Sequence, residues 1–226
     1  MKLRLIDKKH ESADTISFVF KPASPLKWQA GQFLKYHLPD FLSDTRGENR
    51  YFSIASSPVE KNVMLTTKFS EDEGSFFKKH LLSLSLGDQI EVEGPYGKFV
   101  IEDPKINYVF IAGGIGITSF RSIILDLHLQ DKPVNVALLY ANRTTDVVYK
   151  KELTEIALLH PEFKIYYFIG ENRLDSSALK PLVPQTNLFY ISGPERLVES
   201  FEEQLLKLGV SLHQIKRDYF SGYNSL

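Results

Sequence analysis

The sequence predicts two domains of different architecture, an antiparallel β-barrel or sandwich over residues 1–103 and a parallel α/β sheet over residues 104–226. The first part consists of short segments rich in β-branched and aromatic residues, which Gly, Pro, Asn and Asp separate. The second part alternates continuous apolar runs with helical stretches, which is typical of a parallel sheet covered by helices. A chain of 226 residues has room for two modest domains.

The first part alternates apolar and polar residues in several segments, as half-buried strands do. One insertion breaks this pattern, because its large apolar residues recur at helical spacing and a glycine, Gly87, ends it. These apolar residues are Phe76, Phe77, Leu81, Leu82 and Leu84. The expected strands cover residues 14–22, 31–39, 50–56, 62–69 and 88–94, and the expected helix lies within residues 74–87.

The second part begins with a near-continuous apolar run at residues 107–112, which favours a strand buried on both faces. A glycine-rich turn and a helical stretch follow it. Further strands are expected at residues 134–140, 163–170 and 187–192, and further helices at residues 147–159 and 195–209.

Composition excludes several functional classes. The formal net charge of −1 gives no basic excess for binding nucleic acid or an anionic membrane. No apolar run approaches the ~20 residues that a membrane helix needs. The amino terminus mixes charged and apolar residues too finely for a signal peptide, so we expect a cytoplasmic protein.

The chain has no cysteine, which excludes disulfides, thiolate catalysis and a cysteine-ligated iron–sulfur cluster on this chain. Its six histidines are scattered, and no pair has the spacing of a metal site on one helix. We therefore expect no metal site.

The glycine run from Ala112 to Thr118 directly follows the first buried strand and opens a helix. Ligands of open α/β sheets bind at the carboxyl ends of strands, where glycines let the backbone approach a pyrophosphate and the helix N-terminus favours negative charge. The run departs from a strict dinucleotide fingerprint, because Ser119 occupies the third glycine position. A plain strand–helix turn is the alternative interpretation.

Two further positions in the second part favour a nucleotide. Arg143 follows the second strand where an acidic residue usually holds ribose hydroxyls, so it is a candidate for a 2′-phosphate or a solvated loop residue. Ser192, Gly193 and Pro194 end a strand and begin a helix. Ser192 is a candidate helix cap or a nicotinamide contact, and the cap is the more common role.

The first part offers a second possible anion site. Alternation places Arg50 and Phe52 on one face of a strand and Tyr51 and Ser53 on the other. An Arg can bind phosphate with two hydrogen bonds, a ring can stack on a flavin, and a hydroxyl can donate to a flavin nitrogen. The start of the helix, Gly74–Phe76, offers backbone N–H groups to a phosphate, although an ordinary cap at Ser75 explains it equally well.

Taken together and in this order, these residues resemble the ferredoxin–NADP reductase family. The matching segments are AGQF at 30–33, RYFS at 50–53, GSFF at 74–77, GDQIEVEGPYGKF at 87–99, GGIGIT at 113–118 and SGP at 192–194. The resemblance covers essentially the whole chain. It implies an FAD-binding, six-stranded Greek-key β-barrel and a five-stranded parallel NAD(P)-binding sheet, with the flavin between them.

The resemblance also implies roles for individual residues. Arg50, Gly74, Ser75 and Phe76 would hold the FAD pyrophosphate, Phe52 would stack on the flavin and Ser53 would bond near its N5. Leu65, Thr66 and Thr67 would line the flavin. The nicotinamide cofactor would contact Gly114, Gly116, Thr118, Arg143, Ser192, Gly193 and Pro194. Tyr51 would also belong to the cofactor site. A carboxyl-terminal aromatic residue, Phe220 or Tyr223, would cover the other face of the flavin until nicotinamide displaces it.

Three residues depart from the family pattern. Phe52 replaces a Tyr, Ser192 stands where many members carry Cys, and Asp218 replaces a Glu in the ending Asp218–Tyr223. These departures leave FAD binding in place and leave the rate and the NADH/NADPH preference open. A final edge strand is a second interpretation of the same ending.

The resemblance implies an FAD-dependent NAD(P)H reductase, in which Ser53, Ser192 and Phe220 are the candidate catalytic residues. The chain has room for the two core domains alone, so the electron acceptor is expected to be a separate protein such as a ferredoxin, a flavodoxin or an oxygenase component. The alternatives are a free-flavin or ferric reductase and an electron-transfer subunit of a larger enzyme. Paired lysines, namely Lys8, Lys9, Lys78, Lys79, Lys150 and Lys151, are possible contributors to docking or ordinary solvated surface.

Overall fold

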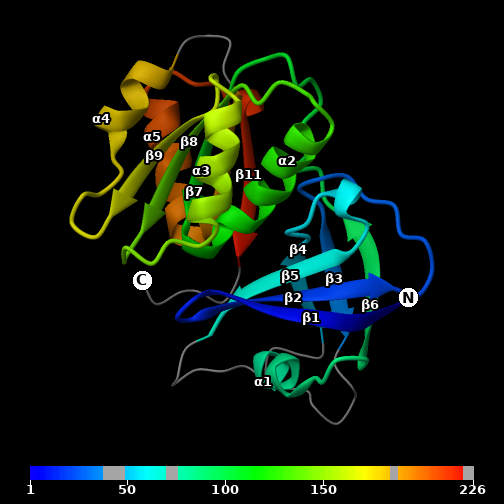
Figure 1. Ribbon diagram of the computed structural model, residues 1–226. Coiled ribbons are helices and arrows are strands. Elements are labelled where there is room, and N and C mark those ends of the chain that lie inside the picture. The colour runs from blue at the N-terminus through cyan, green and yellow to red at the C-terminus, as the bar shows by residue number, and fades with distance from the viewer. Residues whose placement is uncertain (38–48, 70–75, 184–187, 221–226) are drawn as a thin grey trace.

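The computed structural model describes residues 1–37, 49–69, 76–183 and 188–220. Two sheets form the molecule, a six-stranded antiparallel sheet from the first part of the chain and a five-stranded parallel sheet from the second. Figure 1 shows the barrel-like sheet below and the helix-covered parallel sheet above, with β11 reaching down toward the barrel. Both expected sheet types are confirmed.

The first sheet has the strand order β4-β3-β6-β1-β2-β5. A hydrogen bond of 2.8 Å from Ala55 N to Met64 O joins the chain after β4 to β5, at the two ends of this order. The short helix α1, Phe76–Ser83, packs Phe77 and Leu81 into the hydrophobic core that this sheet encloses. The strands are β1 (Lys2–Ser12), β2 (Thr15–Pro22), β3 (Phe33–His37), β4 (Asn49–Ser53), β5 (Val63–Lys68) and β6 (Gln89–Tyr96).

The second sheet has the order β11-β10-β7-β8-β9, and all its pairs are parallel. Every residue of β7 is buried, as its continuous apolar sequence predicts. The strands are β7 (Tyr108–Gly113), β8 (Val136–Asn142), β9 (Lys164–Ile169), β10 (Leu188–Pro194) and β11 (Ile215–Phe220). The helices are α2 (Ile117–Leu129), α3 (Lys150–Leu159), α4 (Ser176–Leu179) and α5 (Glu195–Lys207).

The structure corrects the expected helix at residues 147–159, because α3 begins only at Lys150. Tyr149 has a left-handed backbone with φ of 60°, which a β-carbon disfavours and which ends any helical run there. The buried side chain of Tyr149 instead reaches the barrel, where its hydroxyl hydrogen-bonds Thr66 on β5. A tertiary contact therefore decides where this helix starts.

The sequence singled out neither the 11-residue strand β1 nor the four-residue helix α4. The edge-strand interpretation of the carboxyl-terminal segment is confirmed, because β11 lies at the edge of the parallel sheet. Among the described residues, no helix is both long and apolar enough to cross a membrane.

Candidate functional site between the two domains

Three serine hydroxyls from different elements converge on one carboxylate oxygen where the two sheets meet. Ser119 Oγ donates to Asp218 Oδ2 at 2.6 Å, and Ser53 Oγ and Ser192 Oγ donate to the same atom at 3.3 Å. Ser119 Oγ also lies 2.8 Å from Ser53 Oγ. We call this group of four side chains the serine–aspartate cluster.

The fold explains why these residues meet. Asp218 lies on β11 directly opposite Ser192 on β10, because the two parallel strands pair in that register. Ser119 lies in the first turn of α2, which follows the carboxyl end of β7. Ser53 ends β4 of the barrel, so the cluster connects the two domains. Ligand sites of open α/β sheets lie at these carboxyl strand ends.

The carboxyl of Asp218 is partly buried, and its hydrogen-bond partners among the described residues are neutral hydroxyls. Burial of the carboxyl raises the pKa of Asp218, and the hydrogen bonds from Ser119, Ser192 and Ser53 oppose that rise without cancelling it. The three serines are themselves at most 6% exposed. Such a perturbed group at a domain interface is a candidate functional group.

The glycine turn after β7 leaves space for a ligand. Gly114 has φ of +50°, and a β-carbon built on it meets nothing within 4 Å, so the turn is open on that side. A β-carbon on Gly116 would lie 2.2 Å from Ser192 O, so only glycine fits there. No side chain caps the N-terminus of α2, whose backbone N–H groups therefore remain suited to an anion.

The other residues proposed from the nucleotide half have mixed surroundings. Thr118 is buried, and its hydroxyl donates to Ile115 O at 3.0 Å. Arg143 is exposed just beyond β8. Gly193, with φ of +155°, and Pro194 end β10 beside Gly113 and β11. Pro194 precedes α5, which begins at Glu195.

The helix-cap interpretation of Ser192 is wrong. Helix α5 has no side-chain cap, and Ser192 lies within β10 with its hydroxyl directed to Asp218. The position therefore belongs to the serine–aspartate cluster and not to the start of the helix.

On the barrel side, the expected alternation along β4 is confirmed. Phe52 stacks on Phe77 with ring centroids 5.2 Å apart, on the face that Tyr36 also occupies. Ser53 points the other way, to the parallel-sheet domain. Tyr51 is 60% exposed and packs edge-on against Phe33. Arg50, at the start of β4, donates to Asn49 O at 2.8 Å.

The three β5 residues proposed to line a flavin are all buried. Leu65 packs in the barrel core. Thr66 faces the second domain, where its hydroxyl hydrogen-bonds Tyr149 and lies 2.6 Å from Ser17 Oγ. Thr67 follows it and is 1% exposed.

Some proposed positions lie outside the described residues, namely Gly74, Ser75 and Tyr223. Phe76, the first residue of α1, is 52% exposed. Phe220 ends β11 opposite Pro194 on β10, two residues beyond Asp218 of the serine–aspartate cluster. The sequence predictions for all these residues stay predictions.

Sequence reasoning missed two interface residues, Ser119 and Arg121. Ser119 was noted only as the residue that breaks the glycine pattern, although a hydroxyl at that point of a phosphate-binding turn is itself a signal of polar chemistry. Arg121 gave no signal, because an Arg within an apolar helix resembles a surface residue until its partners are known.

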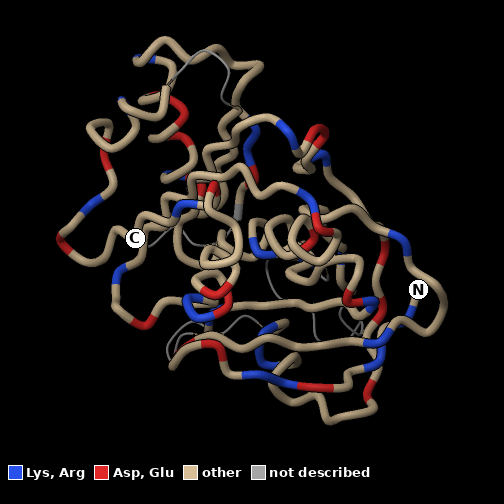
Figure 2. Tube along the Cα trace, turned by 45° about the horizontal axis from the view of Figure 1, so that its top comes forward, with Lys and Arg blue, Asp and Glu red and all other residues tan. Residues whose placement is uncertain are grey.

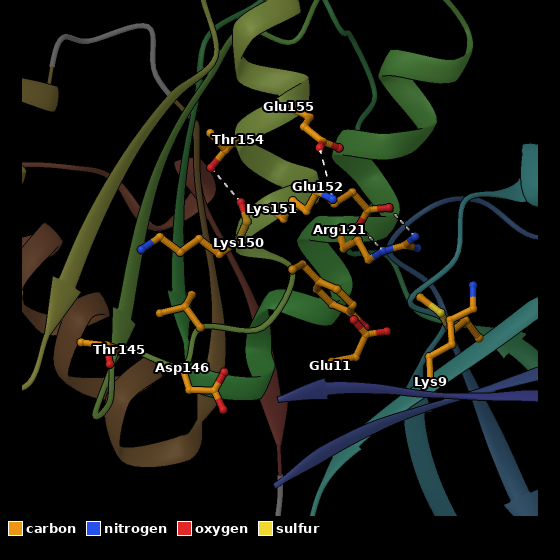
Figure 3. Close-up of a pocket in the computed structure, with 13 residues that line it drawn as sticks. Lys9, Glu11, Arg121, Thr145, Asp146, Lys150, Lys151, Glu152, Thr154 and Glu155 are labelled. Carbon is orange, nitrogen blue, oxygen red and sulfur yellow. Dashed lines mark hydrogen bonds and ion pairs between the residues drawn. The ribbon is translucent and has the colours of Figure 1, made fainter. Parts of the chain in front are cut away.

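Arg121 forms a second polar contact between the domains. Its guanidinium donates to Glu152 Oε2 at 2.6 Å, to Ala55 O at 2.7 Å and to Glu60 Oε2 at 3.2 Å. Its charge lies 5.2 Å from the ring centre of Tyr149. Figure 3 shows Arg121 beside Glu152 at a cleft of about 960 Å³ that the start of α3 and strand β1 also line. We call Arg121 together with Glu60 and Glu152 the Arg121 clamp.

The two halves of the chain match two domain families in order. Residues 2–101 match the oxidoreductase FAD-binding domain, and residues 110–203 match the oxidoreductase NAD-binding domain. The chain belongs to the ferredoxin–NADP reductase family. The two matched families are the FAD-binding and NAD-binding domains of oxidoreductases.

Relatives match between 62% and 98% of the chain. It is 35% identical over 144 residues to the reductase component of phenol 2-monooxygenase from Pseudomonas sp. (strain CF600), a match that covers 62% of this chain and 38% of the relative. It is 25% identical over 252 residues to the flavohemoprotein of Bacillus cereus, which covers 98% of this chain and 61% of the relative. The chain thus spans less than two thirds of the length of these relatives.

Solved structures confirm the family's two-domain fold. The FAD/NAD-binding domain of nitric oxide dioxygenase from Vibrio cholerae superposes with a TM-score of 0.83 at 23% identity, covering 97% of this chain and 98% of that one. Ferredoxin–NADP⁺ reductase from Plasmodium falciparum gives a TM-score of 0.79 at 18% identity, covering 97% and 95%.

The described residues fit the family's cofactors. Buried polar atoms without a hydrogen-bond partner in the described part of the chain lie at both half-sites, namely Tyr36 Oη and Asn49 Oδ1 beside Arg50, and Asn142 Nδ2 at the end of β8. Such orphaned groups are rare in folded proteins and are suited to a polar ligand. The open turn at Gly114 adds a backbone cradle.

The surface charges are mixed. Figure 2 shows Lys and Arg interspersed with Asp and Glu along most of the trace. Of the lysines considered for docking, Lys8 donates to Leu82 O at 2.8 Å and Lys78 to Lys68 O at 2.6 Å. Lys150 lies over the Tyr167 ring, and Lys151 lies 4.0 Å from Glu155. No group of three potential metal ligands occurs among the described residues.

Proposed function

We propose that this protein takes reducing equivalents from NADH or NADPH on an FAD held between its two domains and passes them to a separate electron-acceptor protein. The serine–aspartate cluster carries the proposal. It brings a barrel hydroxyl, Ser53, and a strand-end hydroxyl of the nucleotide domain, Ser192, to one polar point at the interface. The FAD and NAD domains of the family meet there.

Bound FAD supplies the redox chemistry, and the chain supplies binding, orientation and exclusion of water. Arg50 would hold the FAD pyrophosphate and Phe52 would lie against the flavin ring. Ser53 would hydrogen-bond near flavin N5, with Ser192 and Phe220 beside the nicotinamide. The turn at Gly114 and Gly116 would hold the nicotinamide cofactor, with Thr118 fixing the turn through its bond to Ile115.

The proposed acceptor is a protein component of an oxygenase. The support is the similarity to reductase components of phenol-hydroxylating enzymes, at 32% and 35% identity over somewhat more than 140 residues each. Ferredoxin and flavodoxin are the other acceptors that the sequence suggests. We place the division between the two domains at Asp103–Pro104, between the end of β6 and the start of β7.

An anaerobic stopped-flow titration of the purified protein with NADH and NADPH tests the function. We expect the flavin absorbance near ~450 nm to bleach faster with one of the two nucleotides. A protein that neither binds added FAD nor oxidises either nucleotide would contradict the proposal. Flavin that is lost on purification and turned over only as free substrate would support the free-flavin reductase instead.

Replacing Arg50 by Ala should weaken FAD binding about 10- to 100-fold, because a charge-assisted phosphate contact contributes roughly 1.5–3 kcal/mol. Flavin content after purification and the Kd from fluorescence quenching measure this. Arg4→Ala, on the exposed face of β1, is the matched control and should keep full occupancy. Full occupancy in the Arg50 variant would refute the assignment.

Replacing Arg143 by Ala should raise the KM for NADPH about tenfold and leave the KM for NADH nearly unchanged, since only NADPH carries the 2′-phosphate. Steady-state kinetics with both donors measure the ratio. Equal effects on the two donors would show that Arg143 does not contact that phosphate.

A further inference from the structure

We propose that Ser119 is a positioning residue that makes the direction of the Ser53 hydrogen bond depend on the charge state of Asp218. This inference rests on the proposed function only where it assigns Ser53 to the flavin. The hydrogen-bond exchange itself concerns the chain alone.

The geometry gives Ser119 one proton and two acceptors. Its Oγ lies 2.6 Å from Asp218 Oδ2 and 2.8 Å from Ser53 Oγ, and in both contacts Ser119 is placed to donate. A serine hydroxyl carries a single proton, so it serves one of these acceptors at a time. The choice between them is the origin of the switch.

When Asp218 is ionised, it only accepts hydrogen bonds. The Ser119 proton then goes to the carboxylate, because that bond is shorter and charge-assisted. Ser53 also donates to the same oxygen at 3.3 Å. In this state the Ser53 proton points into the cluster, and its lone pairs are available on the other side.

When Asp218 is protonated, it becomes a donor, and its proton is placed to bond Ser119 Oγ. The Ser119 proton then turns to Ser53 Oγ, 2.8 Å away. Ser53 no longer has an anion to bond, so its own proton is free to point out of the cluster. One proton bound by Asp218 therefore changes Ser53 from an outward acceptor to an outward donor.

This exchange matches the two needs of a flavin N5. That nitrogen accepts a hydrogen bond when the ring is oxidised and carries a hydrogen when it is reduced. A Ser53 that donates outward suits the oxidised ring, and a Ser53 that accepts suits the reduced ring. Ser119 would thus link the proton on Asp218 to the redox state without touching the cofactor.

Ser192 provides an internal comparison. It also donates to Asp218 Oδ2, at 3.3 Å, and it is equally buried. The Ser53 hydroxyl bonds Ser119 and not Ser192 among the described contacts, so Ser192 can stabilise the carboxylate without relaying its charge state to Ser53. Among the described residues, burial and the hydrogen bonds from Ser119, Ser192 and Ser53 are what shift the pKa of Asp218, and no charged side chain contributes.

The test begins with the protein free of cofactor, using the infrared carboxyl band of Asp218, assigned with Asp218→Asn, followed against pH. Ser119→Ala should raise the pKa of Asp218 more than Ser192→Ala does, because it removes the shortest bond to the ionised form. Ser119→Thr, which keeps a hydroxyl, should restore the wild-type titration. Equal shifts in the two alanine variants, or no shift in Ser119→Ala, would overturn the proposal.

The second readout uses the FAD-loaded protein and the pH dependence of anaerobic flavin reduction. We expect Ser119→Ala to remove most of that dependence while Ser192→Ala only displaces it. A Ser119 with a purely structural role would lower the melting temperature and leave the profile in place. If no flavin binds, the function fails and the cofactor-free titration still decides the role of Ser119.

Discussion

The Arg121 clamp and the serine–aspartate cluster both connect α2 to the barrel, but their ionisable groups have different partners. Arg121 is 6% exposed and has two carboxylate partners, Glu60 and Glu152. Burial lowers the pKa of Arg121, but the bonds to Glu152 and the nearby negative charges outweigh this and raise it. Within the described part of the chain, Asp218 is bonded by neutral hydroxyls, and burial raises its pKa.

The difference separates a contact that we expect to be structural from one that we propose to be functional. A charge that is fully paired keeps its protonation state across the physiological range, so it can only hold the domains together. A carboxyl held by neutral donors has a protonation state that its surroundings can change. The two contacts start only two residues apart on α2, at Ser119 and Arg121.

The largest effect on stability is expected from Arg121→Met. It leaves Glu60 and Glu152 without their shared cation. Breaking a fully buried ion pair costs about 3–5 kcal/mol of unfolding free energy. We expect about 2 kcal/mol here, because the side chains of both glutamates are about a third exposed. Urea unfolding measures the loss.

Arg217→Met is the matched control, since Arg217 also pairs with a glutamate, Glu202, but from an exposed position. Its loss should be about 0.5 kcal/mol. Equal losses in the two variants would show that burial does not distinguish the clamp. A changed pH profile of flavin reduction in Arg121→Met would remove the functional contrast.

Asp218→Asn should act on the reaction more than on the fold. The folded protein holds a proton on Asp218 above the pH at which the unfolded chain releases it, so wild-type stability falls as pH rises from about 3.8 through the raised pKa. The variant has no titrating group at this position, so its stability does not fall in this way. Its stability relative to wild type should therefore increase over that window and stay constant above it.

In the same variant, flavin reduction by the nucleotide should be about tenfold slower, because one misdirected hydrogen bond raises the activation free energy by roughly 1.4 kcal/mol. The rate should also lose the pH dependence of the wild type. Asp7→Asn, an exposed aspartate on β1, is the control and should change neither property. A variant that loses stability as pH rises, as wild type does, would assign that pH dependence to another group.

The contrast also explains what the sequence could and could not predict. The runs at 107–112 and 134–140 predict buried strands because an apolar run is a local property of the sequence, and the glycine turn predicts a phosphate site from its local chemistry. The convergence of Ser53, Ser119 and Ser192 on Asp218 depends on the register of β10 against β11 and on how the domains meet. Sequence spacing does not carry that information.

The smallest effect is expected from Tyr149→Phe, which tests whether the clamp region depends on hydroxyls as the cluster does. The Tyr149 hydroxyl bonds Thr66 and lies 3.4 Å from Ser17 Oγ, while Thr66 keeps its own bond to Ser17 at 2.6 Å. Because no buried group is left unpaired, the loss should be at most about 1 kcal/mol in urea unfolding. Tyr166→Phe, at 46% exposure, is the control and should be neutral. A loss as large as that of Arg121→Met would mean that the hydroxyl, and not the ion pairs, holds this side of the interface.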